Sequence, residues 1–303
     1  MTDLAGRTFV ITGAASGIGR RIALLAADRG ATVIGWDLNQ AGLDALVDEL
    51  QTRIPGRAHG YQVNVADKDA VAAAGRVVLD EVGPVDVVVN NAGVVSGALI
   101  SDLTDNQIER TFDVNVLALF WVTRAFLPQM MKRGSGHVVT VASAAGLLGV
   151  VRQTDYSASK HAAVGFDESL RVEMRRYAPG VKTTLVCPFY VNTGMFDGAK
   201  SRVPFLLPIL DEGAVAKGIV NAIEKNRARL VLPGTVGLVP LLRALPVSVF
   251  DVVMDVLGIN KSMDEFAGRR PKDESGPATL TSGETSSDAV PAAAALSAAR
   301  AGR

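Results

Sequence analysis

The chain has 303 residues, of which 48% are hydrophobic, so it can bury a sizeable core in one large domain or two small ones. Lysine and arginine together number 31, as do aspartate and glutamate, and this balance argues against a nucleic-acid-binding protein, which needs a basic excess. One cysteine, Cys187, excludes an internal disulfide framework and is typical of a reducing, cytoplasmic compartment, and with only three histidines beside it a metal site is not expected.

From Thr8 to Leu232, short β-branched runs alternate with Ala- and Leu-rich stretches of helical period. This alternation predicts βαβ units and a parallel sheet. Strands are expected at Thr8–Thr12, Thr32–Trp36, Ala58–Asn64, Val85–Asn90, Gly136–Ala142, Val181–Cys187 and Arg229–Leu232, and helices at 17–29, 40–52, 67–82, 105–133, 157–177 and 212–226. Seven strands with six connections predict an α/β fold: a single Rossmann-like, doubly wound parallel sheet flanked by helices. Such a sheet binds ligands beyond the carboxyl ends of its strands.

The first predicted strand runs into a glycine-rich loop, Gly13-Ala14-Ala15-Ser16-Gly17-Ile18-Gly19, where a helix is expected to begin. Its glycines would let the backbone turn tightly and approach a pyrophosphate at the positive end of that helix. The alternative is a glycine-rich connection that binds nothing. The position directly after the first strand favours the dinucleotide interpretation.

The second predicted strand leads to Asp37, eighteen residues past Gly19. A carboxylate there accepts hydrogen bonds from the adenosine ribose hydroxyls and repels a 2′-phosphate, which favours NAD over NADP. Arg20 and Arg21 follow the loop on the predicted helix and could reach inward to meet such a phosphate, which would weaken this preference.

A second group of candidate site residues lies in the middle of the chain. Tyr156 and Lys160 are four residues apart, so they share one face of a helix, and Ser143 precedes Tyr156 by thirteen residues. Residues 90–93 read Asn-Asn-Ala-Gly at the end of the fourth predicted strand, and Asn115 lies in the long helix after it. With the glycine loop, these five motifs, in this order and spacing, resemble the short-chain dehydrogenase/reductase family over about residues 5–232.

The resemblance implies an enzyme that interconverts an alcohol and its carbonyl with a nicotinamide cofactor. Tyr156 would exchange a proton with the substrate oxygen, and Ser143 would bind that oxygen. Lys160 would lower the pKa of the Tyr156 phenol and hydrogen-bond the nicotinamide ribose. Asn115 would hold a water that relays protons between Lys160 and solvent.

The resemblance also implies further contacts with the cofactor. The adenine would meet Asn64 and Val65, and the adenosine ribose would lie beside the Asn90–Gly93 segment, including Asn91, Ala92 and Gly93. The nicotinamide carboxamide would meet Pro188, Val191 and Thr193. Phe189 stands where the commoner family pattern has glycine, which puts the local turn in question.

Three further stretches, near Asn91–Gly97, Phe120–Pro128 and Asn192–Phe196, resemble the branch of retinol dehydrogenases and lipid-associated 17β-hydroxysteroid dehydrogenases. A steroid, retinoid or other lipid-like alcohol is therefore the expected substrate, and segment 194–212 is expected to cover the site as an apolar lid. An NADP-dependent reductase of 3-oxoacyl thioesters or sugars is the alternative, and a non-catalytic nucleotide-binding protein is a remote one.

The remaining residues extend the expected catalytic domain, residues 1–267. The apolar, proline-interrupted extension 233–259 is expected to meet the chain's own core or another subunit, with peripheral membrane contact as the alternative. Residues 268–303, rich in Ala, Ser, Thr, Pro and Gly, are expected to form a disordered tail. Family resemblance implies a homodimer or homotetramer that pairs through the helices at 105–133 and 153–177.

Overall fold

Seven parallel strands form one sheet in the computed structural model, which describes residues 2–268. Their spatial order is β3-β2-β1-β4-β5-β6-β7. The strands are β1 (Thr8–Thr12), β2 (Thr32–Asp37), β3 (Ala58–Gln62), β4 (Val87–Asn90), β5 (Gly136–Val141), β6 (Val181–Pro188) and β7 (Arg229–Leu232). The order runs in opposite directions on the two sides of the β1–β4 pair. This reversal is the topological switch point, and it confirms the predicted doubly wound sheet.

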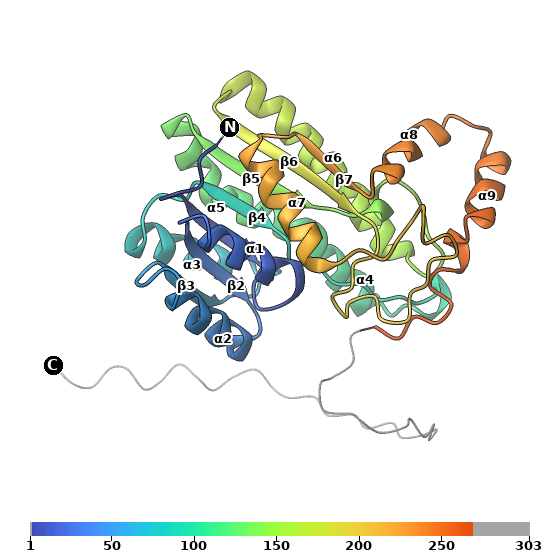
Figure 1. Cartoon of the computed structure of the whole chain (residues 1–303), viewed down its shortest axis with the longest axis horizontal. Helices are drawn as coiled ribbons and strands as arrows, with labels where there is room; N and C mark the ends of the chain where they lie inside the picture. Colours follow the sequence, from blue (N-terminus) through green and yellow to red (C-terminus); the bar gives the residue numbers. More distant parts are fainter. Residues whose placement is uncertain (1, 269–303) are drawn as a thin grey trace. The chain divides into compact units, whose positions relative to one another are not determined.

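Helices cover both faces of the sheet (Figure 1). One face carries α1 (Gly17–Ala27), α2 (Gln40–Gln51) and α7 (Glu212–Glu224), which bury their apolar sides in one core cluster. The other face carries α3 (Lys68–Glu81), α4 (Asp105–Phe112), α5 (Ala118–Arg133) and α6 (Thr154–Tyr177). Because both faces are covered, the central strand β4 reads as an uninterrupted buried run, Val-Val-Val-Asn.

Several predicted boundaries differ from the structure by one to three residues. The strand expected to reach Asn64 ends at Gln62, and the helix expected from 157 begins at Thr154. The single helix expected over 105–133 contains a π-helical turn, Asp113–Leu117, between α4 and α5. A π turn changes the backbone hydrogen bonding over a few residues without ending the helix, so a long stretch of helical character does not reveal it.

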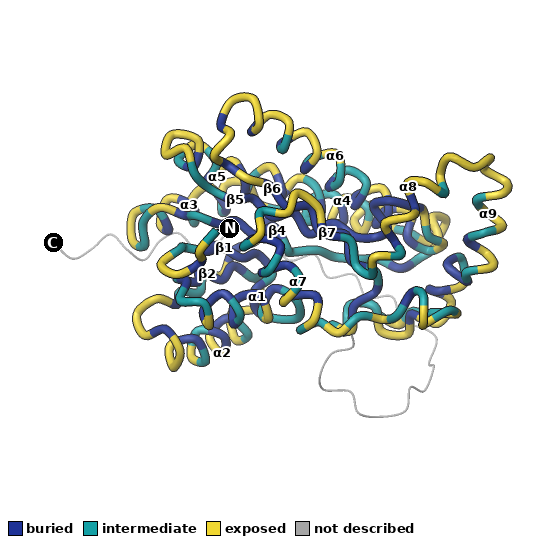
Figure 2. The backbone as a smooth tube through the Cα atoms, turned by 45° about the horizontal axis from the view of Figure 1, so that its top comes forward, coloured by how far each residue is buried: buried dark blue, intermediate teal, exposed yellow. Residues whose placement is uncertain are grey.

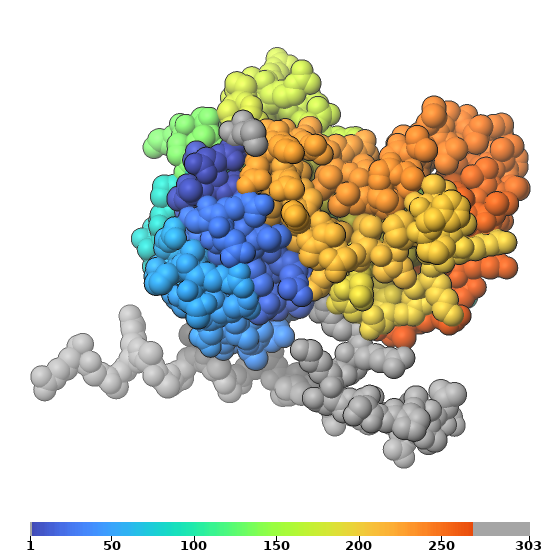
Figure 3. All heavy atoms as spheres, viewed as in Figure 1, coloured from blue at the N-terminus to red at the C-terminus, as the bar shows by residue number. Residues whose placement is uncertain are grey.

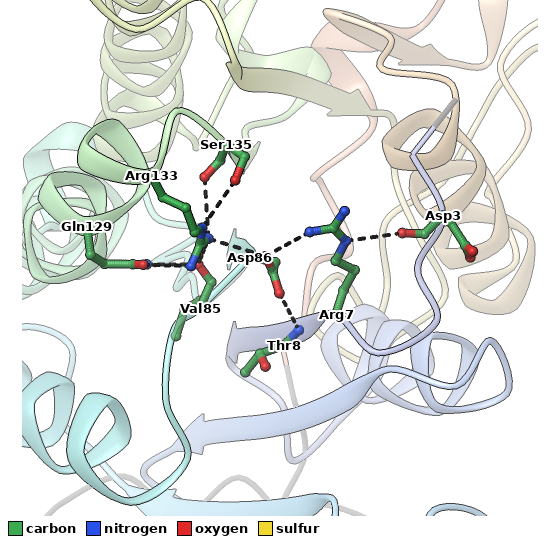
Figure 4. Close-up of polar contacts among 8 residues, drawn as sticks. All are labelled: Asp3, Arg7, Thr8, Val85, Asp86, Gln129, Arg133 and Ser135. Carbon is green, nitrogen blue, oxygen red and sulfur yellow. Dashed lines mark hydrogen bonds and ion pairs between the residues drawn. The ribbon is translucent and has the colours of Figure 1, made fainter.

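The amino-terminal edge of the sheet is held together by one carboxylate, Asp86 (Figure 4). It accepts hydrogen bonds from the backbone N–H of Thr8 at 3.0 Å and from Arg7 Nη1 at 3.1 Å. Arg133 at the end of α5 donates to the same carboxylate at 3.2 Å and to the carbonyl of Val85 at 2.8 Å. The cluster therefore ties β1, the start of β4 and α5 together at the end of the sheet remote from the predicted site.

After β7 the chain leaves the sheet through two short helical turns and two helices. These are η4 (Gly234–Leu238), α8 (Val239–Leu242), α9 (Val247–Val256) and η5 (Ile259–Lys261). The described residues fall within one compact unit, Met1–Arg270. The tail predicted over 268–303 lies, beyond Gly268, outside the described residues.

One helical run, Asp105–Arg133, is long and apolar enough to cross a membrane by length and composition alone. In the structure it is the α4–α5 layer on the sheet, and it carries the fully buried Phe126 and Met130. A core helix meets the same criteria of length and composition, so this run does not define a membrane span.

Candidate active site

The predicted site lies at the carboxyl ends of β1 and β4, beside the switch point. Gly13 and Gly17 have positive φ angles of 67° and 55°, a region that other residues adopt only with strain. A Cβ on Gly13 would lie 3.0 Å from Asn91 Nδ2, and one on Gly17 would lie 3.3 Å from Thr193 Cβ. Side chains there would press against the segments that follow β4 and β6, so the glycines let the loop pack closely between these segments, as a tight dinucleotide-binding turn requires.

Helix α1 begins directly at the end of this loop. Its N-cap residue, Ser16, makes no side-chain hydrogen bond to the helix, and its first turn has no acidic residue. The first N–H groups of a helix, here those of Gly17, Ile18 and Gly19, have no partner within the helix and favour an anion. The start of α1 is therefore suited to a phosphate group.

The two arginines that follow the loop pair with carboxylates. Arg20 Nη2 binds Glu49 on α2, and Arg21 Nε donates to Glu212 Oε1 on α7 at 2.8 Å. Both guanidinium groups thus have partners away from the carboxyl end of β2, where a ribose 2′-phosphate would lie.

Asp37 closes β2 with its carboxylate fixed by the backbone. Its Oδ2 accepts a hydrogen bond from the Ala15 N–H at 3.0 Å, and its Oδ1 accepts one from the Asn39 N–H at 3.0 Å. The contact with Ala15 joins the acidic residue to the glycine loop across 22 positions of sequence. Asp37, which is predicted to bind the ribose, therefore lies next to the loop that is predicted to bind the phosphates.

Thr12 joins the glycine loop to the segment that follows β4. Its Oγ1 accepts hydrogen bonds from the backbone N–H groups of Asn91 and Ala92, both at 3.0 Å. The Asn91 side chain donates in return to the Thr12 carbonyl at 2.9 Å. Thr12 was not among the residues singled out from the sequence, because only the fold shows that a strand-end hydroxyl serves a loop 79 positions away.

Two of the predicted adenosine contacts differ in how their side chains are placed. The Asn90 amide points into the core and donates to Thr123 Oγ1 at 3.0 Å, away from the surface of the segment. Asn64 is exposed just after β3, and its Oδ1 accepts the Ala66 N–H at 3.1 Å, whereas Val65 is buried.

Tyr156 and Lys160 lie on the same face of α6 and are both buried. Lys160 Nζ is 5.6 Å from the centroid of the Tyr156 ring and donates a hydrogen bond to the Val141 carbonyl at 3.0 Å. A Cβ built on Gly93 would lie 3.5 Å from the same nitrogen. The end of β5, the Asn-Asn-Ala-Gly segment and α6 therefore converge on one ammonium group.

Ser143 follows β5 and borders Tyr156. The Ser143 hydroxyl accepts the Ala145 N–H at 3.1 Å and lies near enough to the Tyr156 phenol to lower its pKa. Asn115 lies in the π turn, where its amide donates to Val94 O at 2.9 Å and Ser159 Oγ at 3.0 Å. The structure thus gathers all four residues predicted for the chemistry.

Burial decides the protonation of this cluster. It raises the pKa of the Tyr156 phenol well above its usual range, and the Ser143 hydroxyl only partly opposes that effect. Burial also lowers the pKa of the Lys160 amine to about 8. We expected Lys160 to lower the phenol's pKa. In this structure burial is the largest of the effects on that pKa.

The segment after β6 crosses in front of this cluster. Phe189 donates its backbone N–H to the Leu232 carbonyl at 2.7 Å, which continues the pairing of β6 with β7 by one residue. Val191 then bridges to Leu210, and Thr193 lies against Gly17. Pro188, Val191 and Thr193 therefore stand between the glycine loop and the predicted lid.

Aromatic residues line the lid side of the site. The Phe196 ring meets the Tyr156 ring edge-on at 5.6 Å and the Tyr190 ring at 5.2 Å. A cavity of about 170 Å³ lies beside them, lined by Tyr190, Val191, Asn192, Phe196, Asp197, Gly198, Ala199 and Ile209. Sequence reasoning placed Phe196 in an apolar lid but could not show that it touches Tyr156.

Tyr190 belongs to a buried polar network that the sequence did not suggest. Its hydroxyl pairs with Ser262 Oγ at 2.8 Å and accepts a hydrogen bond from Gln153 Nε2 at 3.3 Å. The network joins the segment after β6, the residue before α6 and the residue after η5. Its members are up to 109 positions apart (Gln153 to Ser262), so no local pattern signals it.

A doubly wound sheet with a glycine loop at its switch point and a buried Tyr–Lys pair on the adjoining helix defines a nicotinamide-dependent oxidoreductase of the alcohol–carbonyl class. The chain belongs to the short-chain dehydrogenase family, whose sequence model matches residues 7–203.

Individual relatives agree with this assignment. The chain is 38% identical to epidermal retinol dehydrogenase 2 of Mus musculus, across 89% of this chain and 88% of the relative. It is 38% identical to estradiol 17-beta-dehydrogenase 11 of Rattus norvegicus, across 89% of each chain. Among solved structures, a short-chain dehydrogenase/reductase from Burkholderia phymatum in complex with NAD is 27% identical, with a TM-score of 0.73 over 92% of this chain and all of that one.

Proposed function

We propose that this protein is an NAD(H)-dependent oxidoreductase that interconverts a hydrophobic alcohol, steroid, retinoid or lipid-like, and its carbonyl compound. The observation that carries the proposal is the placement of Tyr156, with Ser143 against its phenol and Lys160 on the same helix face, beside Gly93 at the switch point. A bound nicotinamide dinucleotide would supply or accept the hydride. The chain's own residues would handle the proton and the substrate oxygen.

Each residue has a role that its surroundings support. The Tyr156 phenol is neutral at neutral pH, since burial raises its pKa, so it is ready to donate a proton to a carbonyl oxygen. Ser143 would bind the same oxygen and stabilise negative charge on it. Lys160, with a pKa of about 8, is still mostly protonated at neutral pH and can return a proton to the phenol. Asn115 sits in a π turn, where a helix can offer a main-chain carbonyl to the relay water that the family resemblance implies.

The preference for NAD rests on Asp37. Its carboxylate is held at the glycine loop by the Ala15 N–H, where it would repel a 2′-phosphate. Arg20 and Arg21, the nearest bases in sequence, already pair with Glu49 and Glu212. We expect initial rates with NADH to exceed those with NADPH. Faster turnover with NADPH would favour the alternative, a reductase of 3-oxoacyl thioesters or sugars.

The substrate class rests on the relatives and on the lid. The retinol and estradiol dehydrogenases similar to this chain act, by their names, on large apolar alcohols. Phe196 and Tyr190 present aromatic faces beside the Tyr156 ring, a surface that suits an apolar ligand. A spectrophotometric screen of steroids, retinoids, long-chain alcohols and small ketones with both cofactors would identify the substrate.

The decisive experiment replaces Tyr156 with phenylalanine. Removing only the hydroxyl should leave NADH affinity within about twofold and lower kcat by about 100- to 10,000-fold, since proton transfer contributes that much to such reactions. Tyr177→Phe, an exposed tyrosine at the end of the same helix, is the matched control and should behave as wild type. Undiminished turnover in Tyr156→Phe would refute the assignment, and no turnover in any variant with any alcohol would favour the non-catalytic alternative.

We further propose that the protein is a cytoplasmic homo-oligomer. Exposed apolar side chains on α5 and α6, Phe120 and Val172 among them, provide a surface on which two copies can pair. Cys187 is buried and unbridged, in keeping with a reducing compartment. Light scattering at several protein concentrations would measure the assembly, and a monomer at every concentration would contradict it.

A further inference from the structure

An apolar hairpin stands out from the sheet at the end that carries β7 (Figures 1 and 3). We call residues 238–256, which comprise α8, α9 and the turn between them, the α8–α9 hairpin. Its exposed large apolar side chains are Leu238, Leu241, Leu245, Val247, Val249, Val252 and Val256. Leu241 is 72% exposed and Val247 is 76% exposed, and Figure 2 shows the hairpin as a largely exposed limb. An apolar group of this kind marks an interaction surface, since isolated exposed residues would not cluster along one segment.

Helix α9 has two apolar sides rather than one. Met254 on the inner side is buried in the core that continues beneath the lid, with Phe250 and Val253 packed beside it. Val249, Val252 and Val256 recur at helical spacing on the outer side, and all are exposed. We expected segment 233–259 to meet the core or a subunit. The inner side of α9 confirms the core contact, and the outer side is left open within the described chain.

Polar groups are confined to the margins of this surface. Between Ala244 and Phe250 there is no charged residue, and Arg243 at the base of the turn donates to the Leu147 carbonyl at 3.0 Å. Asp251 and Asp255 lie on a separate stripe of α9, and Asp255 Oδ1 accepts a hydrogen bond from Asn260 Nδ2 at 2.6 Å. The protruding turn therefore offers aliphatic carbon without a charge to be desolvated.

The chemistry of this surface distinguishes between classes of partner. Protein interfaces carry about one hydrogen bond per 100–200 Å² and concentrate their binding energy in aromatic and arginine side chains. Most exposed side chains of the hairpin are Leu, Val, Ala or Pro, and none is aromatic. The exposed polar ones lie apart from the outer valines: Arg243 at the base of the turn, and Ser248, Asp251 and Asp255 along one stripe of α9. Lipid tails require no hydrogen bonds and adapt to a convex tip. The two aspartates beside it disfavour an anionic surface.

We propose that the α8–α9 hairpin docks on an electrically neutral lipid surface and inserts its exposed aliphatic side chains among the lipid tails. The lid adjoins this surface: Leu206 accepts a hydrogen bond from Thr235 Oγ1 at 2.7 Å and packs on the same core as α9, and the neighbouring Phe205 is 90% exposed. Docking would bring the lid to the lipid phase, so that an apolar alcohol could pass to the site without crossing water. This last consequence rests on the proposed function; the docking itself does not.

Vesicle flotation tests the proposal with the full chain. Wild type should float with phosphatidylcholine vesicles, and neither high salt nor added anionic lipid should increase the bound fraction. The triple variant Val249→Ser/Val252→Ser/Val256→Ser should have a vesicle partition coefficient at least about tenfold lower than that of wild type. Each substitution removes apolar surface that lipid would bury. The control Val77→Ser changes an exposed valine on α3, far from the hairpin (Figure 1), and should float as wild type does.

A tryptophan reporter, Val247→Trp, gives a second reading that does not depend on flotation. Its emission should shift to shorter wavelength when phosphatidylcholine vesicles are added and should remain unshifted without them. Equal flotation of the triple variant and wild type would overturn the proposal. A second outcome would also overturn it: the Val247→Trp emission is already blue-shifted without vesicles, and the triple substitution dissociates an oligomer. In that case this face would join two copies of the chain. NADH binding and Tyr156-dependent turnover of a soluble alcohol are read separately, so failure of the docking leaves the proposed function intact.

Discussion

Asp167 on α6 is a buried carboxyl whose titration should be visible in the stability of the protein. It is 1% exposed and packs beneath the sheet, where one of its oxygens, Oδ1, has no hydrogen-bond partner in the described chain. Burial raises its pKa to about 7 from an ordinary 3.8, against the smaller opposing effects of Thr140 and Arg171. At a pH between these two values, the Asp167 carboxyl is therefore protonated in the folded state and ionised in the unfolded state.

The sign and size of the effect follow from that difference. Because the folded-state pKa is the higher one, the stabilising contribution is present below about pH 4 and is lost as the pH rises through 7. One pK unit corresponds to about 1.36 kcal/mol. Between about pH 5 and about pH 8, the carboxyl should cost the fold roughly 2–3 kcal/mol. Asp167→Asn cannot ionise, so its free energy of unfolding should be free of this loss.

The assay is denaturant unfolding of wild type and Asp167→Asn at about pH 5 and about pH 8, with the change in free energy between the two pH values compared. Other titrating groups, the histidines included, are common to both proteins and cancel in the difference. Glu173→Gln, an exposed carboxylate on the same helix, serves as the control and should follow wild type. Parallel stability curves for wild type and Asp167→Asn would refute the assigned pKa and the reasoning from burial.

Three further substitutions test the scaffold of the site. Gly13→Ala places a side chain at a positive φ and 3.0 Å from Asn91 Nδ2, so it should lower the free energy of unfolding by about 1 kcal/mol or more. It should also weaken NADH binding in a fluorescence titration. Unchanged affinity would argue against cofactor contact with this loop. Thr12→Val removes the acceptor of the Asn91 and Ala92 N–H groups and should lower the free energy of unfolding by about 1–3 kcal/mol, and a neutral effect would mean that water replaces the hydroxyl. Asp86→Ala removes the partner of a backbone N–H and of two arginines at the end of the sheet remote from the site. It should lower the free energy of unfolding by about 2 kcal/mol, measured by thermal unfolding, and leave NADH affinity unchanged. A loss of affinity would show that this end of the sheet is coupled to the site.

The site was predictable to the extent that its residues follow strands. Gly13 and Ser143 follow a strand within two residues and Asp37 ends one, and the carboxyl ends of parallel strands meet at one edge. Tyr156 and Lys160 share a face because a helical turn brings residues four apart together. The direction of the phenol's pKa shift was not predictable, because it depends on burial by segments distant in sequence.

The sequence by itself determined the order of strands and helices and the glycine-rich nature of the loop after β1. It also singled out the four residues that we propose for the chemistry, since each of these features depends on local spacing. Only the tertiary structure revealed that Thr12 holds the segment after β4, that Phe196 touches Tyr156, and that α9 leaves an apolar side uncovered. The physical reason is the same in all three cases. A contact between residues far apart in the chain, or the lack of one on a helix face, is set by how the layers pack, and an apolar side chain reads the same in the sequence whether the fold covers it or leaves it exposed.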